Sequence, residues 1–186
     1  LHNSLVSCNT YLEYGSGGST VLAAKSTPIV VTTDSDPLFL AAVRKTINSY
    51  QLNCNVHYVY PDIGFTKQWG YPCISSSWPQ ARSKWPQYPK APWTVLKSLD
   101  LVPDLVFVDG RFRVASALTS LLNLKMNANA KILVDDYFDR PSYHILEHVM
   151  DLQAIIDKRL AVFRPLTSLS CSCLTALVEI FSLDPS

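Results

Sequence analysis

The chain has 186 residues, of which 48% are hydrophobic, and its charged residues nearly cancel at a formal net charge of +1. This composition suits one globular domain with a sizeable core, and it excludes a disordered chain and a general nucleic-acid-binding protein. No apolar run approaches the roughly 20 residues of a membrane-spanning helix, so no membrane span is expected. The chain begins at Leu1 rather than Met, so we expect that a preceding segment has been removed, and we expect a cytoplasmic protein.

Short apolar segments alternate with helical ones along most of the chain. Strands are expected at 9–14, 28–34, 54–60, 103–109 and 130–136. Helices are expected after Ser19, after the Asp36–Pro37 start, and near 112–124 and 142–157. The last two segments, 159–166 and 174–183, are expected to form an antiparallel hairpin. The alternation indicates parallel strands with right-handed crossovers. The predicted fold is therefore an α/β three-layer sandwich with a seven-stranded, mostly parallel sheet.

A segment at about 64–94 interrupts this alternation within the single predicted domain. No acidic residue lies between Asp62 and Asp100, and all of the tryptophans lie there: Trp69, Trp78, Trp85 and Trp93. Five prolines in the same stretch oppose a long regular helix, whereas the tryptophans oppose disorder. We expect a folded, irregular insertion. Its basic residues and aromatics indicate either a lid over an anionic substrate or a solvated rim around side chains that cover the sheet.

Three of the six glycines follow the first predicted strand, in the stretch YLEYGSGGST at 11–20. Glycine allows positive φ and lets a ligand approach the main chain without a Cβ, and the next helix offers free N–H groups. Open parallel sheets bind ligands beyond the carboxyl ends of their strands. The loop therefore predicts a cofactor site, with a tight turn that holds no ligand as the alternative. The G-K-[ST] ending of a P-loop is missing, and Thr20 stands where G-x-G-x-x-G needs its third glycine.

Glu13 and the glycines after it form the pattern E-x-G-x-G, which resembles the first motif of class I S-adenosylmethionine (SAM)-dependent methyltransferases. The resemblance covers nearly the whole chain in order, and it implies a seven-stranded sheet whose last strand is antiparallel. It implies further that SAM is the cofactor and that Glu13 and the loop contact it. The loop residues concerned are Gly15, Ser16, Gly17, Gly18 and Ser19.

Three aspartates match further cofactor contacts of this family. Asp34 ends the second predicted strand, where the family has the acid that binds ribose, and a carboxylate can accept from two vicinal hydroxyls. Asp62 follows the third strand, where an acid or amide meets the adenine, and Asp109 is placed in the cofactor site as well. Because an acid about 20 residues after the first glycine also suits dinucleotides, an NAD-dependent oxidoreductase stays an alternative. A SAM- or nucleotide-binding module without catalysis is another.

Asp109 ends the fourth predicted strand, and Asp135 and Asp136 end the fifth. Neighbouring strands would bring the three carboxylates to one rim, where they repel unless a cation or a proton intervenes. The arrangement is similar to the catechol O-methyltransferase-like branch of the family, which implies that these aspartates hold Mg²⁺ or another divalent cation. One alternative is that Asp109 is a catalytic base without metal. The other is that the aspartates cap a helix and pair with arginines, namely Arg111, Arg113 or Arg140.

Side chains expected at the same rim are candidates for substrate binding, and they are Trp69, Arg111, Tyr137 and Arg140. The asparagine-proline-proline-aromatic signature of many amino-directed methyltransferases is absent from the sequence. We therefore expect an O-directed methyltransferase that acts on a small or anionic acceptor, and not on nucleic acid.

His144, Glu147 and His148 fit the H-x-x-E-H pattern of some zinc proteases. An amphipathic helix explains them more simply, because an apolar stripe through Ile145 and Val149 would leave them on its water-facing side. No zinc site is expected here.

Overall fold

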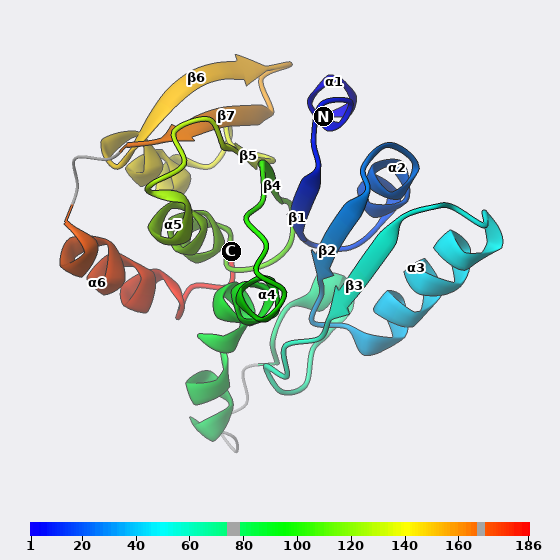
Figure 1. Cartoon of the computed structure of the whole chain (residues 1–186). Coiled ribbons are helices and arrows are strands. Elements are labelled where there is room, and N and C mark those ends of the chain that lie inside the picture. Colours follow the sequence, from blue (N-terminus) through cyan, green and yellow to red (C-terminus); the bar gives the residue numbers. More distant parts are fainter. Residues whose placement is uncertain (74–78, 167–169) are drawn as a thin grey trace.

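The computed structural model describes residues 1–73, 79–166 and 170–186. These residues form a seven-stranded sheet with the strand order β3-β2-β1-β4-β5-β7-β6 (Figure 1). The strands are β1 (Thr10–Tyr14), β2 (Ile29–Thr33), β3 (Asn55–Val59), β4 (Leu105–Val108), β5 (Lys131–Val134), β6 (Met150–Ile156) and β7 (Leu160–Pro165). Strands β1 to β5 are parallel, whereas β7 is antiparallel to both of its neighbours, β5 and β6. The predicted fold class is confirmed.

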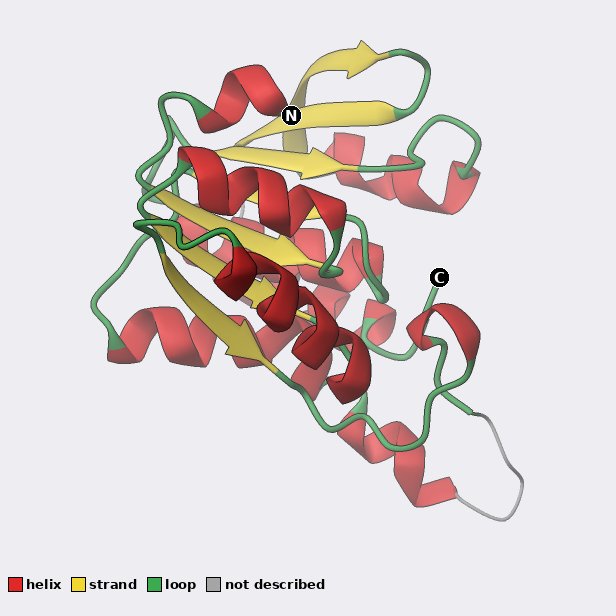
Figure 2. Ribbon diagram, turned by 90° about the vertical axis from the view of Figure 1, so that its right-hand side faces the viewer, coloured by secondary structure: helices red, strands yellow, loops and turns green. Residues whose placement is uncertain are grey.

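Helices cover both faces of the sheet. They are α1 (His2–Leu5), α2 (Gly18–Ser26), α3 (Pro37–Ser49), α4 (Gln87–Ser98), α5 (Arg113–Leu124) and α6 (Cys171–Phe181). Three 3₁₀ segments accompany them: η1 (Gln68–Gly70), η2 (Pro79–Lys84) and η3 (Pro141–His148). Figure 1 places α2 and α3 to one side of the sheet and α5 and α6 to the other, and Figure 2 shows the strands between the two helical layers.

The strands are buried because alternate side chains enter two separate cores. Leu12 and Tyr14 of β1 belong to the core that α4, α5 and α6 cover. Tyr11 of the same strand belongs to the core beneath α1 and α2. Helix α3 begins where the sequence predicts, since the Asp36 side chain accepts hydrogen bonds from Leu38 N at 2.9 Å and from Phe39 N at 3.1 Å.

The prediction for the last quarter of the chain is wrong in two elements. The segment expected as a helix at 142–157 forms η3 and β6, and the segment expected as a strand at 174–183 lies in α6. Asp157 and Lys158 both adopt φ of 52°, the left-handed conformation that tight hairpin turns require, so β6 turns directly into β7. The expected antiparallel hairpin exists, but it forms one element earlier than predicted.

Helix α6 begins after Ser170, whose hydroxyl accepts a hydrogen bond from Cys173 N at 3.2 Å. Leu174 and Val178, four residues apart, are its buried side chains. This spacing places both on one helix face, and their packing outweighs the β-branched composition that suggested a strand.

The insertion at about 64–94 is less irregular than expected. Its last part belongs to α4, a helix of 12 residues that includes Pro89 and Pro92, contrary to the expectation that proline would exclude one. Pro89 lies in the first turn, where a missing N–H breaks no helical bond, and Trp93 with Leu96 anchors the helix in the core. Trp85 is also buried, whereas Trp69 is 80% exposed; Trp78 lies outside the described residues.

None of the helices in the described part of the chain combines the length and the hydrophobicity that crossing a bilayer requires.

Candidate functional site

A cavity of about 830 Å³ lies at the carboxyl ends of the parallel strands. Most of the residues that the sequence singles out line it. From the glycine loop these are Gly15, Ser16, Gly17, Gly18 and Ser19; from the other loops they are Asp34, Trp69, Asp109, Arg111, Asp135, Asp136 and Arg140. Glu13, Asp62 and Tyr137 are not among the lining residues.

The glycine loop presses against the loop after β4. Gly15 has φ of +93°, and a Cβ there would lie 2.7 Å from Gly110 Cα, so a larger residue meets both backbone strain and a main-chain clash. A Cβ at Gly17 or Gly18 would meet no atom within 4 Å. Gly15 therefore allows the loop to pack directly against Asp109 and Gly110. At Gly17 and Gly18 the absence of a side chain leaves the main chain open to a ligand.

Glu13 holds this loop from beneath. Its buried carboxylate accepts hydrogen bonds from the hydroxyls of Tyr11 and Thr32, both at 3.1 Å, and from that of Thr20. The Thr20 oxygen in turn accepts a hydrogen bond from Gly17 N at 2.8 Å. Burial raises the pKa of Glu13, and the hydroxyl donors partly offset that rise. Glu13 thus acts through Thr20 on the main chain of the loop, from a place outside the cavity.

Asp34 lies beside the loop and lines the cavity. Its two carboxylate oxygens accept hydrogen bonds from Ser16 N at 3.1 Å and from Asp36 N at 2.9 Å. Burial raises its pKa, although the backbone donors oppose the rise. The carboxylate is therefore oriented by main chain on both sides while it stays next to the open cavity.

Asp62 lies apart from this site. Its side chain is 54% exposed, forms an ion pair with Lys84 and accepts a hydrogen bond from Gly64 N. Both interactions lower its pKa, that of Lys84 more. Nothing in this arrangement directs the carboxylate toward the glycine loop.

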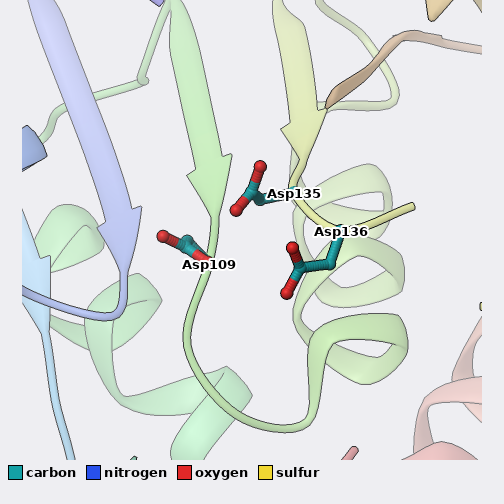
Figure 3. A group of neighbouring side chains, drawn as sticks. All are labelled: Asp109, Asp135 and Asp136. Atoms are coloured by element: carbon teal, nitrogen blue, oxygen red, sulfur yellow. The ribbon is translucent and has the colours of Figure 1, made fainter. Parts of the chain in front are cut away.

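The three aspartates that follow β4 and β5 converge (Figure 3). Asp109, Asp135 and Asp136 each place a carboxylate oxygen within 4.8 Å of the others. They form the one cluster of possible metal ligands that residues 1–73, 79–166 and 170–186 contain.

Arginines already occupy the space around these carboxylates. Arg113, 4% exposed at the start of α5, lies 3.1 Å from Asp109 and 3.1 Å from Asp136. It also donates to the main-chain oxygens of Gly110 and Asp135. Arg159, before β7, binds both oxygens of Asp135, and Arg140 lies 3.4 Å from Asp136.

A divalent ion does not fit this arrangement of side chains. Each carboxylate has a guanidinium partner, and the buried Arg113 bridges two of the three. An ion on all three aspartates would have to displace it or lie next to its charge, which Coulomb repulsion opposes. The arginines, rather than a metal ion, balance the charge of these carboxylates.

Asp109 and Asp135 differ in their affinity for protons. Burial raises the pKa of Asp109 to about 7, with Arg113 opposing and the two neighbouring aspartates adding to the rise. Burial also acts on Asp135, but hydrogen bonds from Arg159 and Asp109 outweigh it and lower its pKa. Asp109 is thus the carboxyl of this cluster that exchanges a proton near neutral pH.

Arg111 lies in the loop between β4 and α5, two residues after Asp109, with its Cζ 4.2 Å from the centre of the Tyr71 ring. It is 9% exposed, and its Nε and Nη1 have no hydrogen-bond partner among the described residues. Trp69 stands near Tyr71 at the rim. Tyr137 is fully buried, and its hydroxyl donates to Glu147 at 2.8 Å, so the structure places it in the core.

The histidines of the H-x-x-E-H pattern lie on η3, and both His144 and His148 are exposed. His144 stacks on Tyr137, which also engages Glu147. The amphipathic helix expected at these residues is wrong, because the segment forms the 3₁₀ segment η3.

Three residues of this site are not predicted by the sequence patterns above. Thr20 stands where a third glycine is expected, Tyr71 belongs to no motif, and Arg159 lies in a hairpin that forms one element earlier than the sequence predicts. The sequence does contain an indication that Tyr71 contributes to the site, since Tyr71 lies two residues after Trp69 in a segment rich in basic and aromatic residues.

Comparisons with known proteins agree with this architecture. No protein-family model and no curated protein sequence matches the chain. Among solved structures, a methyltransferase-like protein from Silicibacter pomeroyi is 29% identical, with a TM-score of 0.82 over 99% of this chain and 92% of that one.

Two further structures are similar at lower identity. The S-adenosylhomocysteine (SAH)-bound methyltransferase PaMTH1 from Podospora anserina has 18% identity and a TM-score of 0.53 over 86% of this chain and 72% of that one. An rRNA methylase from Streptococcus thermophilus has 10% identity and a TM-score of 0.54 over 89% of this chain and 93% of that one. The chain therefore has the class I methyltransferase fold, as the sequence resemblance implies.

Proposed function

We propose that this protein is a SAM-dependent methyltransferase that acts on an oxygen atom of a small or anionic acceptor. The observation that carries the proposal is the pairing of bare main chain at Gly17 and Gly18 with the carboxylate of Asp34 on one cavity wall. The likeness to a methyltransferase-like protein over 99% of this chain supports it.

The cofactor site follows from these groups. Gly17 and Gly18 let a ligand approach the N-terminus of α2 closely, and the free N–H groups there favour a negative or polar ligand group. Asp34 accepts from the two ribose hydroxyls, because Ser16 N and Asp36 N hold its carboxylate in place. Glu13 supports this site from below through Thr20, and Asp62 contributes to adenine binding only if its pair with Lys84 opens.

Asp109 is placed for proton transfer. When bound, SAM supplies an electrophilic methyl group on a sulfonium. Asp109 adjoins the glycine loop, and with a pKa near 7 its carboxylate can accept the proton of an acceptor hydroxyl at neutral pH. Arg113 orients it at 3.1 Å, and Arg159 keeps the neighbouring Asp135 ionised.

Trp69 and Arg140 supply the outer wall. Trp69 is 80% exposed at the rim, in a short turn that the Thr66–Pro72 bridge closes. An aromatic side chain in that position can cover the acceptor and exclude water during transfer. The structures of methyltransferases that share this fold include an rRNA methylase, but the buried Arg111 and the paired arginines of the cavity favour a small acceptor.

Binding and turnover test the proposal separately. SAM and SAH should raise the melting temperature, because a ligand that binds the native state stabilises it, and NAD should not. SAH should then form when SAM is incubated with a panel of hydroxylated carboxylic acids. Stabilisation by NAD alone would contradict the cofactor. SAM binding without turnover, and with an Asp109→Asn variant identical to wild type, would indicate a binding module.

A further inference from the structure

Arg111 stands out among the arginines of the cavity because it is buried without an anionic partner. It is 9% exposed and lines the cavity; its buried Nε and Nη1 have no hydrogen-bond partner among the described residues, and it forms no ion pair with any of them. Its neighbour is the Tyr71 ring, 4.2 Å from Cζ. By contrast, Arg113, Arg140 and Arg159 each form an ion pair with an aspartate.

An unpaired buried charge is costly, and so is a buried N–H without an acceptor. A cation–π contact offsets only a small part of that cost. A buried polar group without a partner calls for an explanation, and a ligand or ion that completes it is one. The acids of the cavity are engaged elsewhere: Asp109, Asp135 and Asp136 pair with the other arginines. The carboxylates of Asp34 and Asp36 accept from main-chain N–H groups and form no ion pair with Arg111.

A second orphaned group lies nearby. The hydroxyl of Tyr143 is fully buried and has no hydrogen-bond partner among the described residues. Burial raises its pKa, and the charges of Arg113, Arg140 and Arg111 oppose that rise, so the hydroxyl lies within the field of these three cations. The Arg140 guanidinium is 5.5 Å from its ring. The region therefore contains one guanidinium without an anionic partner and two kinds of buried hydrogen-bond donor without an acceptor.

The position of this region relates it to the proposed cofactor site. A Cβ at Gly70 would lie 3.8 Å from Arg111 Cγ and 3.9 Å from Asp34 Oδ1. Asp109 is two residues before Arg111 on the same loop. An anion on Arg111 would thus belong to a molecule that reaches the space between the ribose-binding carboxylate and the proposed base.

We propose that Arg111 binds an oxyanion, a carboxylate or phosphate, of the methyl acceptor and so selects acidic acceptors. The proposal rests on the proposed function above. The same chemistry is present in the carboxylate of the cofactor's methionine, and the experiment separates the two sources.

The experiment measures anion binding to the wild-type protein saturated with SAH. Benzoate, acetate and inorganic phosphate are titrated by calorimetry, with benzamide as the uncharged counterpart of benzoate. At least one anion should bind while benzamide does not. Arg111→Met should weaken that binding about tenfold or more, because a charge-assisted hydrogen bond is lost, and Arg111→Lys should retain part of it. Arg44→Met is the matched control, since Arg44 also lies over a tyrosine ring but does not line the cavity.

The cofactor is titrated in parallel as SAH and as methylthioadenosine, which lacks the carboxylate. Arg111→Met should bind both as wild type does. A variant that loses affinity for SAH but not for methylthioadenosine would overturn the proposal, because Arg111 would then bind the cofactor. Failure of all three anions to bind wild type would overturn it as well.

Stability gives an independent readout. Without ligand, Arg111→Met should melt at or above the wild-type temperature, because an unpaired buried charge has been removed. A marked loss of stability in both Arg111→Met and Arg111→Lys would indicate a structural role and overturn the proposal. If wild type binds an anion through Arg111 but binds no SAH, the proposed function fails while the anion site stands.

Discussion

The guanidinium of Arg113 lies 3.1 Å from the carboxylate of Asp109, and it is almost fully buried where β4 and β5 end. This contact determines how the acidic cluster is neutralised. Three carboxylates converge, and the cation between two of them is a side chain of the same protein.

Replacing this cation should destabilise the fold strongly. We expect Arg113→Met to lower the free energy of unfolding by about 2–4 kcal/mol, because two half-buried carboxylates and the main-chain oxygens of Gly110 and Asp135 lose their donor. Arg140→Met is the control and should cost less than about 1 kcal/mol, since Arg140 is 35% exposed and 3.4 Å from Asp136. Urea denaturation at pH 8 measures both.

The same variants test the predicted metal. Millimolar Mg²⁺ should leave the wild-type melting temperature unchanged and should raise that of Arg113→Met, in which the carboxylates become free to bind a cation. EDTA should not alter wild-type turnover. Stabilisation of wild type by Mg²⁺ together with loss of turnover in EDTA would show that the metal prediction is right and that Arg113 moves aside.

Removing the Thr20 hydroxyl should weaken both the fold and cofactor binding, although Thr20 does not line the cavity. Thr20→Val keeps the shape of the side chain but removes a donor to Glu13 and an acceptor for Gly17 N. A loss of about 1–3 kcal/mol in stability is expected from the unsatisfied groups, together with weaker SAH binding. Thr20→Ser should restore both; wild-type stability in Thr20→Val would contradict the role given to Glu13.

Two glycines of one loop should respond differently to alanine. Gly17→Ala places a Cβ in open space, so stability should change by less than about 1 kcal/mol while SAH binding falls at least tenfold. Gly15→Ala should cost more than about 3 kcal/mol, because its Cβ meets main chain at 2.7 Å and its φ is +93°. Unaltered SAH affinity in a folded Gly17→Ala variant would mean that no ligand approaches there.

Asp109 should control the pH dependence of activity. The value of kcat/KM should rise with pH through about 7, as the carboxyl loses its proton, and Asp109→Asn should lower it about 100-fold or more. The comparison is made between pH 5 and 8 with saturating SAM. A pH-independent profile in wild type would remove Asp109 as the base.

The Asp109→Asn substitution, which should lower activity, should raise stability at high pH. Because the folded pKa of Asp109 lies above its ordinary 3.8, its contribution to stability is fully present below pH 3.8 and is lost as pH rises through about 7. Asp109→Asn should therefore be more stable than wild type at pH 8, and this difference should be smaller at pH 5. The gain should be modest, since the side chain is 35% exposed.

Local sequence patterns predict the secondary structure correctly in the part of the fold where buried strands and helices differ in composition. The first five strands and the start of α3 at Asp36 were predicted because β-branched runs and a cap followed by proline are strong local signals. The secondary structure at the end of the chain was not predicted correctly. There η3, β6 and α6 are short segments, and contacts with distant elements decide whether each is a helix or a strand. Nothing local distinguishes Ile155–Ile156 at a strand end from the apolar face of a helix.

The candidate site divides in the same way. Glycines, and aspartates at strand ends, can be recognised because their place along the chain implies their place on the sheet edge. The arginine partners of those aspartates cannot be recognised in this way. Arg159 lies 24 residues from Asp135 in the sequence, and it reaches Asp135 because β7 pairs with β5. The orphaned state of Arg111 is a property of burial and missing partners, which no spacing in the sequence encodes.

The most direct test of the account is a calorimetric titration of SAH into wild type and into Asp34→Ala. Asp139→Ala is the control, since Asp139 is exposed and does not line the cavity. Wild type and Asp139→Ala should bind one SAH per chain, and Asp34→Ala should bind at least about tenfold more weakly, because the ribose hydroxyls lose a charged acceptor. Absence of SAH binding to wild type, or equal affinity in Asp34→Ala, would contradict the assignment of this cavity to SAM.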